Sequence, residues 1–317
     1  VFSSAPTGGH SFFGIIYATA DYLNAGGTFP AGSTGSPSIT FTTDTDTGIY
    51  RRGSGDIGFV SNSTEIVNID GNGLTVTSKD ATINSVTVGK GANSVAGNTV
   101  LGETALDASV SGGNNTAIGK DSLTACTSGS SNVAVGSGAL SSNTTASSNT
   151  AVGQNALQSN STGTLNTAIG KSALGTNNTA SNNTAVGTNA LLVNTTGTRN
   201  TAVGSLSLDA NTTANDNQAF GYLALSANTT GGSNSAFGSS ALGTNTTGAS
   251  NCAFGTGSLA SNSTGNNNTA IGASTLNQNS TGTRNTAVGT NALDACTTGN
   301  DNVGIGQNAL GAATTAS

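Results

Sequence analysis

The chain has 317 residues, of which 46 are glycine, none is methionine or tryptophan, and only 7% are charged. Too few large apolar side chains are present to fill the cores of the two or three globular domains that this length would suggest. The net charge of −6, with eight Lys and Arg scattered along the chain, argues against nucleic-acid binding, which needs clustered cations. The sequence has no run of 18 apolar residues and so predicts no membrane insertion.

Residues 1–36 are expected to form an N-terminal docking segment followed by a linker. The run from Phe12 to Tyr17, Phe-Phe-Gly-Ile-Ile-Tyr, is apolar and favours a strand or short helix that docks on another protein or subunit. Residues 26–33, Gly-Gly-Thr-Phe-Pro-Ala-Gly-Ser, have the composition of a loop. We expect His10, the only histidine, to lie on the surface.

Residues 37–88 predict a small module of β-hairpins. Apolar and polar residues alternate in short runs separated by Asp-Gly and Asn-Gly, which accept the positive φ of tight turns. Asp44, Asp46 and Gly48 have the spacing of the start of a calcium loop. An EF-hand loop would need Glu at its twelfth position, which here is Gly55, so we expect an acidic turn without a metal.

The stretch from Ser38 to Arg51 reads Ser-Ile-Thr-Phe-Thr-Thr-Asp-Thr-Asp-Thr-Gly-Ile-Tyr-Arg, and Gly-Phe-Val (58–60) and Ile-Asp-Gly-Asn-Gly-Leu (69–74) follow it. Together these residues resemble a module of tailed-bacteriophage fibre and other virion structural proteins. The resemblance covers residues 37–76. It implies a structural β element that supplies no catalytic residue.

A 17-residue unit repeats from Asn98 to the end of the chain, thirteen times without slippage. Numbered from its first Asn, the unit has three positions that never vary: Asn at one, Gly at five and Leu at nine. In two central units these residues are Asn149, Gly153, Leu157, Asn166, Gly170 and Leu174. A fixed period of this length predicts an all-β domain over residues 89–317, a parallel β-solenoid with one unit per rung.

Within each rung we expect an extended segment at positions two to four, a bend at the glycine, and a second extended segment at positions eight and nine. Val152 and Leu157 are expected to point inward, and the small Ala151 and Ala156 to let neighbouring backbones approach. The Asn at position one suits either a side-chain amide ladder or a turn with left-handed φ. Residues 85–89 imitate the first five positions and predict a shortened first rung.

The repeated Asn-Thr-Ala-Val-Gly resembles the head repeat of trimeric autotransporter adhesins, which carries a Ser-Val-Ala-Ile-Gly-like motif. The resemblance implies a left-handed parallel β-roll packed as a homotrimer. Two departures weaken the comparison in detail. The unit is longer than the family's usual one, and Thr replaces Val at position two, so one inward apolar position is lost or redirected.

Few residues are candidates for a functional site. Phe220, Phe237 and Phe254 occupy position four of consecutive units and are expected to be a stacked aromatic core rather than an exposed sugar-binding strip. Tyr222, beside them, is the candidate for a surface contact. Thr at position fourteen in eleven of thirteen units leaves an ice-binding face as a further alternative.

The inventory of reactive side chains argues against an enzyme. The repeat region has no His and one Glu, whereas a glycoside hydrolase needs two carboxylates facing one sugar bond. We therefore expect no catalytic residue, no cofactor and no metal. Cys126 and Cys296 lie ten rungs apart, about 48 Å at the usual strand spacing, and cannot form a disulfide.

The pairing of a fibre-like module with a long repeat predicts a non-enzymatic, homotrimeric fibre component of a tailed-phage virion. Its N-terminal region would contact other virion proteins, and its rod would space or present a surface for a host receptor or glycan. The alternative is the head of a trimeric autotransporter-type adhesin on a bacterial cell surface.

Overall fold

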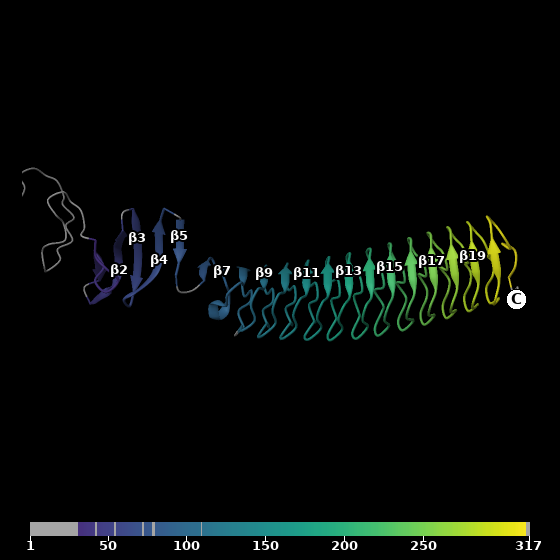
Figure 1. The fold of residues 1–317 in the computed structure, drawn as a ribbon, viewed down its shortest axis with the longest axis horizontal. Coiled ribbons are helices and arrows are strands. Elements are labelled where there is room, and N and C mark those ends of the chain that lie inside the picture. The colour runs from purple at the N-terminus through teal and green to yellow at the C-terminus, as the bar shows by residue number, and fades with distance from the viewer. Residues whose placement is uncertain are drawn as a thin grey trace, which may run out of the picture. The chain divides into compact units, whose positions relative to one another are not determined.

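A computed structural model describes residues 31–314, except positions 42, 54, 72, 78, 79 and 109 (Figure 1). The predicted docking cluster from Phe12 to Tyr17 and His10 lie outside the described residues. The chain divides into two compact units, Val1–Lys79 and Asp80–Ser317. In the described residues the regular structure is β, apart from one turn of 3-10 helix at Ala92–Ser94.

The first unit contains a five-stranded antiparallel sheet in which each strand pairs with the next along the chain. The strands are β1 (Ile39–Phe41), β2 (Asp44–Gly53), β3 (Asp56–Ser61), β4 (Thr64–Asp70) and β5 (Gly73–Val76). The hairpins are present as predicted, but the sheet ends at Val76, and residues 80–88, which the prediction included in this module, fall in the second unit.

The predicted acidic turn is wrong in its conformation, because Asp44 and Asp46 lie in strand β2. Both alternate with threonine, a β-branched residue that favours extended backbone. Asp46 accepts a hydrogen bond from the Ser63 hydroxyl at 3.0 Å, and that contact ties β2 to the turn between β3 and β4. Among the described residues, no group of three or more His, Cys, Asp or Glu side chains could hold a metal ion.

The second unit is a parallel β-solenoid, as predicted. Thirteen strands, β8 to β20, are joined by parallel pairings in which each residue lies opposite its counterpart 17 positions along, as Thr150 does with Thr167. The strands are β8 (Thr99–Gly102), β9 (Thr116–Ile118), β10 (Val133–Val135), β11 (Thr150–Val152), β12 (Thr167–Ile169), β13 (Thr184–Val186), β14 (Thr201–Val203), β15 (Gln218–Phe220), β16 (Ser235–Phe237), β17 (Cys252–Phe254), β18 (Thr269–Ile271), β19 (Thr286–Val288) and β20 (Val303–Ile305).

The predicted first rung at residues 85–89 is wrong. These residues belong to an N-terminal hairpin of β6 (Ala81–Ile83) and β7 (Val86–Gly89), and β7 runs antiparallel to β8 with Val88 opposite Leu101. The connection over residues 90–98 explains the direction, because a parallel crossover needs a dozen or more residues.

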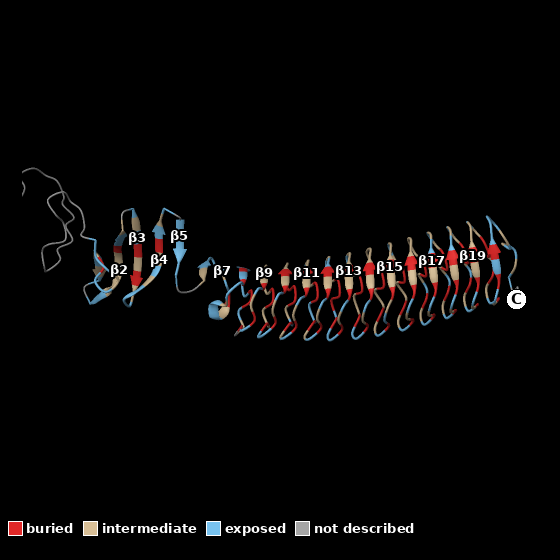
Figure 2. Cartoon of the chain, in the orientation of Figure 1, coloured by how far each residue is buried: buried red, intermediate tan, exposed pale blue. Residues whose placement is uncertain are grey.

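The core of the solenoid consists of small and large side chains from two parts of each rung. Alanine at position three and leucine at position nine are buried in almost every rung, as Ala151 and Leu157 are (Figure 2). The expectation that Val152 points inward is wrong. Successive strand side chains alternate between faces, so with Ala151 inside, positions two and four face outward.

The second extended segment predicted at positions eight and nine is also absent from the described rungs, where these residues form a turn. Asn155 and Leu157 have left-handed φ angles of 57° and 50°. The Leu157 N–H donates to the Ala173 carbonyl of the next rung at 3.0 Å, so the turn contributes to stacking although it is no strand.

The glycine at position five makes the predicted bend. Close stacking of the rungs is a second reason why this position is glycine. Gly153 has a φ of +133°, and a Cβ there would lie 2.6 Å from the carbonyl oxygen of Gly170 in the next rung. A side chain at this position would therefore be strained by the backbone and excluded by the neighbouring rung.

Candidate functional site

The asparagines at position one form a buried ladder, as the first of the two alternatives predicted. From Asn115 onward each backbone N–H donates to Oδ1 of the preceding Asn, as Asn200 does to Asn183, and most side-chain amides donate to the same oxygen. Asn115, Asn200, Asn217 and Asn234 make the backbone bond alone. The Asn166 side-chain amide donates to Asn149 Oδ1 at 3.2 Å and to the Ala180 carbonyl at 2.8 Å, and its backbone N–H donates to the same Asn149 oxygen at 3.0 Å. The left-handed backbone lies one residue earlier, at position seventeen, as at Leu165. The ladder is therefore structural and leaves no free amide for a ligand.

A second buried ladder, at position twelve, was missed from the sequence. It runs from Asn143 to Asn279, and each amide donates to the oxygen of the preceding Asn, as Asn160 does to Asn143 at 3.2 Å. The ladder could have been predicted from the Asn that recurs at position twelve in every unit between Cys126 and Cys296. Both thiols are buried and free, and burial raises the pKa of Cys126. At the C-terminal end Asn279 Oδ1 is buried with no partner among the described residues.

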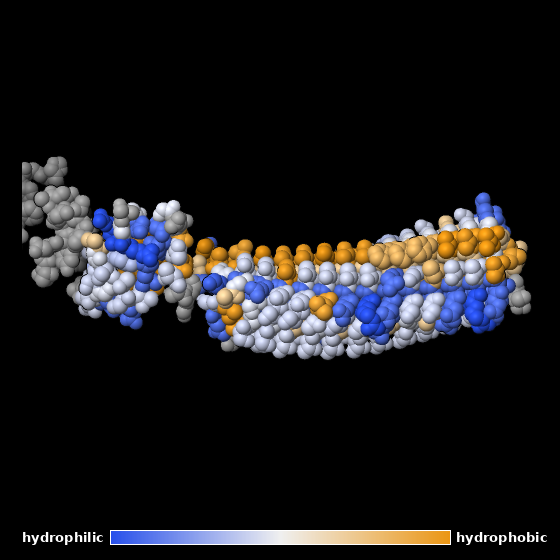
Figure 3. Space-filling view, in the orientation of Figure 1, coloured by the Kyte–Doolittle hydropathy of each residue, from blue (hydrophilic) through white to orange (hydrophobic). Residues whose placement is uncertain are grey.

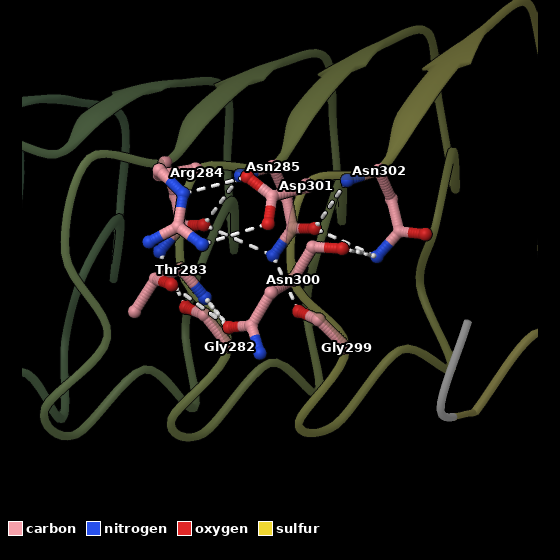
Figure 4. A network of polar contacts seen from close by, with 9 residues as sticks. Gly282, Thr283, Arg284, Asn285, Gly299, Asn300, Asp301 and Asn302 are labelled. Atoms are coloured by element: carbon pink, nitrogen blue, oxygen red, sulfur yellow. Dashed lines mark hydrogen bonds and ion pairs between the residues drawn. The ribbon is translucent and has the colours of Figure 1, made fainter. Parts of the chain in front are cut away.

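The polar side of the solenoid carries two equivalent ion pairs. Arg284 contacts Asp301 in the next rung through Nε–Oδ1 at 2.6 Å and Nη2–Oδ2 at 2.7 Å, and beside them Thr283 N donates to Asn300 Oδ1 at 2.8 Å (Figure 4). Arg199 and Asp216 repeat this arrangement. Each arginine lowers the pKa of its aspartate by hydrogen bonding. These exposed pairs tie adjacent rungs, and each arginine's charge is already matched.

The most extended surface feature is an apolar ridge formed by the position-four side chains of the stacked strands. Figure 3 shows it as a continuous hydrophobic band along the solenoid. The ridge residues are Leu101, Ile118, Val135, Val152, Ile169, Val186, Val203, Phe220, Phe237, Phe254, Ile271, Val288 and Ile305. None is buried, and Ile169 and Ile271 are 41% and 43% exposed.

The three phenylalanines stack as predicted, but their side chains face outward from the parallel sheet and are not part of the core. Ring centroids are 4.7 Å apart between Phe220 and Phe237 and 4.3 Å between Phe237 and Phe254, with nearly parallel planes. Phe254 is 43% exposed, so the stack is part of the apolar ridge. Tyr222 is 54% exposed and keeps its place as a surface candidate.

The apolar ridge continues into the N-terminal hairpin. Val88 lies opposite Leu101 and is 40% exposed, while Ile83, opposite Val86, is 62% exposed. No helix among the described residues is long and apolar enough to cross a membrane. The ridge and its continuation in the hairpin form an exposed apolar surface, which is suited to contact with a partner.

Comparison with protein-family models, with curated proteins and with solved structures gave no match. The resemblances to phage fibres and to adhesin heads therefore rest on the residues quoted for them.

Proposed function

We propose that this chain is a non-enzymatic fibre component of a tailed-phage virion, in which three copies associate along their apolar ridges to form a rod. The ridge is the observation that carries the proposal. Twelve intervals between thirteen strands, at about 4.8 Å each, give a solenoid roughly 58 Å long.

The area of the apolar ridge suits a stable interface. A phenylalanine that is 43% exposed, as Phe254 is, leaves on the order of 70–100 Å² open, and the smaller ridge residues leave somewhat less. Summed over the ridge, this approaches the roughly 800 Å² that each partner contributes to a standard interface, and exceeds the few hundred Å² that monomers usually expose.

The charge distribution also favours contact between copies. Positions two and four, the two outward positions of each strand, carry no charged residue in any of the thirteen units. Charged side chains at position six, beside the ridge, occur in three units only, as Glu103, Lys120 and Lys171. Ridges of identical chains can therefore approach without burying unpaired charge. The number three comes from the resemblance to trimeric adhesin heads.

The assignment to a virion is supported by the fibre-like module at residues 37–76. In this proposal the N-terminal region contacts other virion proteins, and the solenoid holds a recognition surface at a distance. Recognition of a host receptor or glycan would fall to exposed, variable positions such as Tyr222.

The second candidate is the head of a trimeric bacterial surface adhesin, and the Asn-Thr-Ala-Val-Gly repeat favours it. Immunogold electron microscopy with antibodies against residues 98–314 separates the two. Labelling of tail or capsid fibres on purified phage particles would support the first proposal. Labelling of the surface of phage-free cells, with none on particles, would overturn it in favour of the adhesin.

A further inference from the structure

We infer that the first unit carries a second self-association surface, an apolar sheet face on which the sheet of another copy of this chain packs. The inference rests on the proposed homo-oligomer for its partner, but it concerns a different surface from the apolar ridge. Its basis is the register of the five strands.

The pairing of the strands gathers the large apolar residues on one face of the sheet. Ile57 lies opposite Ile69, which lies opposite Leu74, and Phe59 lies opposite Val67. Residues directly opposite one another, and residues two apart on one strand, share a face. The apolar sheet face consists of Ile39, Ile49, Ile57, Phe59, Val67, Ile69, Leu74 and Val76, with Arg51 as its one charged member.

The buried residues of this unit lie on the opposite face. Tyr50, Val60 and Asn68 are 7%, 2% and 2% exposed, and the Tyr50 ring lies over Gly58, where a Cβ would collide with it. On the apolar sheet face, by contrast, none of the eight apolar residues is buried, and Ile57 and Leu74 are 46% and 68% exposed. The unit therefore has its small core on one side and its larger apolar surface uncovered.

A sheet with an apolar face is stable when another layer covers that face. Among the described residues of the first unit there is no helix to do so. The eight side chains expose on the order of 500 Å², which is near the upper end of the largest apolar patch on a typical monomer, and patches of that size are often interaction sites. The face is therefore suited to packing against another layer.

The sheet of a second copy is the partner we infer for this face, because association of the solenoids would hold the two sheets near one another. Only residues 77–80 separate β5 from β6 in the sequence, so each sheet is tethered to its own solenoid by a short connection. When apolar ridges hold copies side by side, their sheets are confined to a small volume, and the high effective concentration makes a modest apolar contact favourable. Only Arg51 opposes such packing, and its charged group can extend past the apolar surface into water.

The test uses the full chain with a cysteine on either face of β5, as Leu74→Cys or as the control Thr75→Cys, which lies opposite Asn68 on the other face. Reaction with N-ethylmaleimide is followed by mass spectrometry of the β5 peptide, and sedimentation reports the assembly state of each sample. In the assembled protein we expect Leu74→Cys to react at least about tenfold more slowly than Thr75→Cys, and to lose this protection on dilution to single chains.

The outcomes separate this inference from the proposed function. Equal reactivity of the two cysteines in an assembled sample would overturn the inference and leave the ridge association standing. Protection of Leu74→Cys that persists in single chains would also overturn it, because the cover would then come from the same chain. A protein that sediments as single chains at all concentrations would overturn the proposed assembly and this inference together.

Discussion

Three residues stabilise each rung, and each acts through its own counterpart in the next rung. The position-one asparagine binds the amide of its neighbour, the position-five glycine lies against the next glycine, and the position-nine leucine is fully buried in the column of leucines. Because these contacts join consecutive rungs, one change of backbone or side chain would disturb two neighbouring rungs.

At the residue scale, Gly238→Ala is expected to destabilise the solenoid. Gly238 has a φ of +137°, and a Cβ would lie 2.6 Å from the Gly255 carbonyl oxygen, so we expect a cost of about 2 to 4 kcal/mol. The matched control is Gly243→Ala in the same rung, where the nearest atom is 3.2 Å away and the next rung already has Ala260. Urea denaturation should show a lower midpoint for the first variant only; equal midpoints would contradict the role given to the glycine.

Replacing Cys296 by asparagine is expected to stabilise the solenoid. The new amide would continue the position-twelve ladder and donate to Asn279 Oδ1, which has no partner among the described residues. One added buried hydrogen bond is worth about 1 kcal/mol. Cys296→Ala supplies no donor and is the control. A thermal midpoint for Cys296→Asn at or below that of Cys296→Ala would show that the ladder does not extend in this way.

The sequence allowed the period, the invariant positions and the stacking to be predicted, because all three follow from spacing alone. The sequence could not show whether Val152 and Phe254 face the inside of the solenoid or the solvent. A three-residue strand turns either its middle residue or its two flanking residues inward, and spacing does not decide between them. In the structure the alanine at position three takes the inside, where it is buried together with the leucine at position nine.

At the scale of elements, the N-terminal hairpin protects the first edge of the parallel sheet. An exposed edge offers unpaired backbone groups to other chains, and β7 covers that edge by pairing with β8. Asp80 fixes the turn after β7, since its carboxylate accepts hydrogen bonds from the backbone N–H groups of Lys90, at 2.6 Å, and Gly91. The direction of β7 was predicted wrongly because residues 85–89 resemble the start of a rung. The connection from β7 to β8 is too short for a parallel crossover.

Asp80→Ala is therefore expected to open the N-terminal edge. Two charge-assisted hydrogen bonds are lost, each worth about 1.5 to 3 kcal/mol, so local opening should increase at least about tenfold. Hydrogen exchange measured by mass spectrometry should speed up in β7 and β8 and stay unchanged in β15. Asp56→Ala, in the other unit, is the control. Unchanged exchange in β8 would show that Asp80 does not secure the hairpin.

For the whole molecule, stability and assembly have different sources. Within the solenoid each rung contacts only its neighbours, so its stability accumulates along the axis as in other repeat proteins. In the proposed assembly, copies associate through outward side chains that this internal stacking does not use, namely the apolar ridge and, by our inference, the apolar sheet face. Function in this account lies in the association of copies, which the repeat period alone does not reveal.

The most direct test of that account is the mass of the full chain in solution by sedimentation equilibrium. Three copies of 30.5 kDa predict 91.5 kDa for the unmodified protein. The double variant Ile169→Asp, Ile271→Asp, which places two carboxylates in the apolar ridge, should shift the mass toward 30.5 kDa, whereas Leu165→Asp, at an exposed position outside the ridge, should leave it unchanged. A mass of 30.5 kDa for the unmodified chain at micromolar concentration would contradict the account.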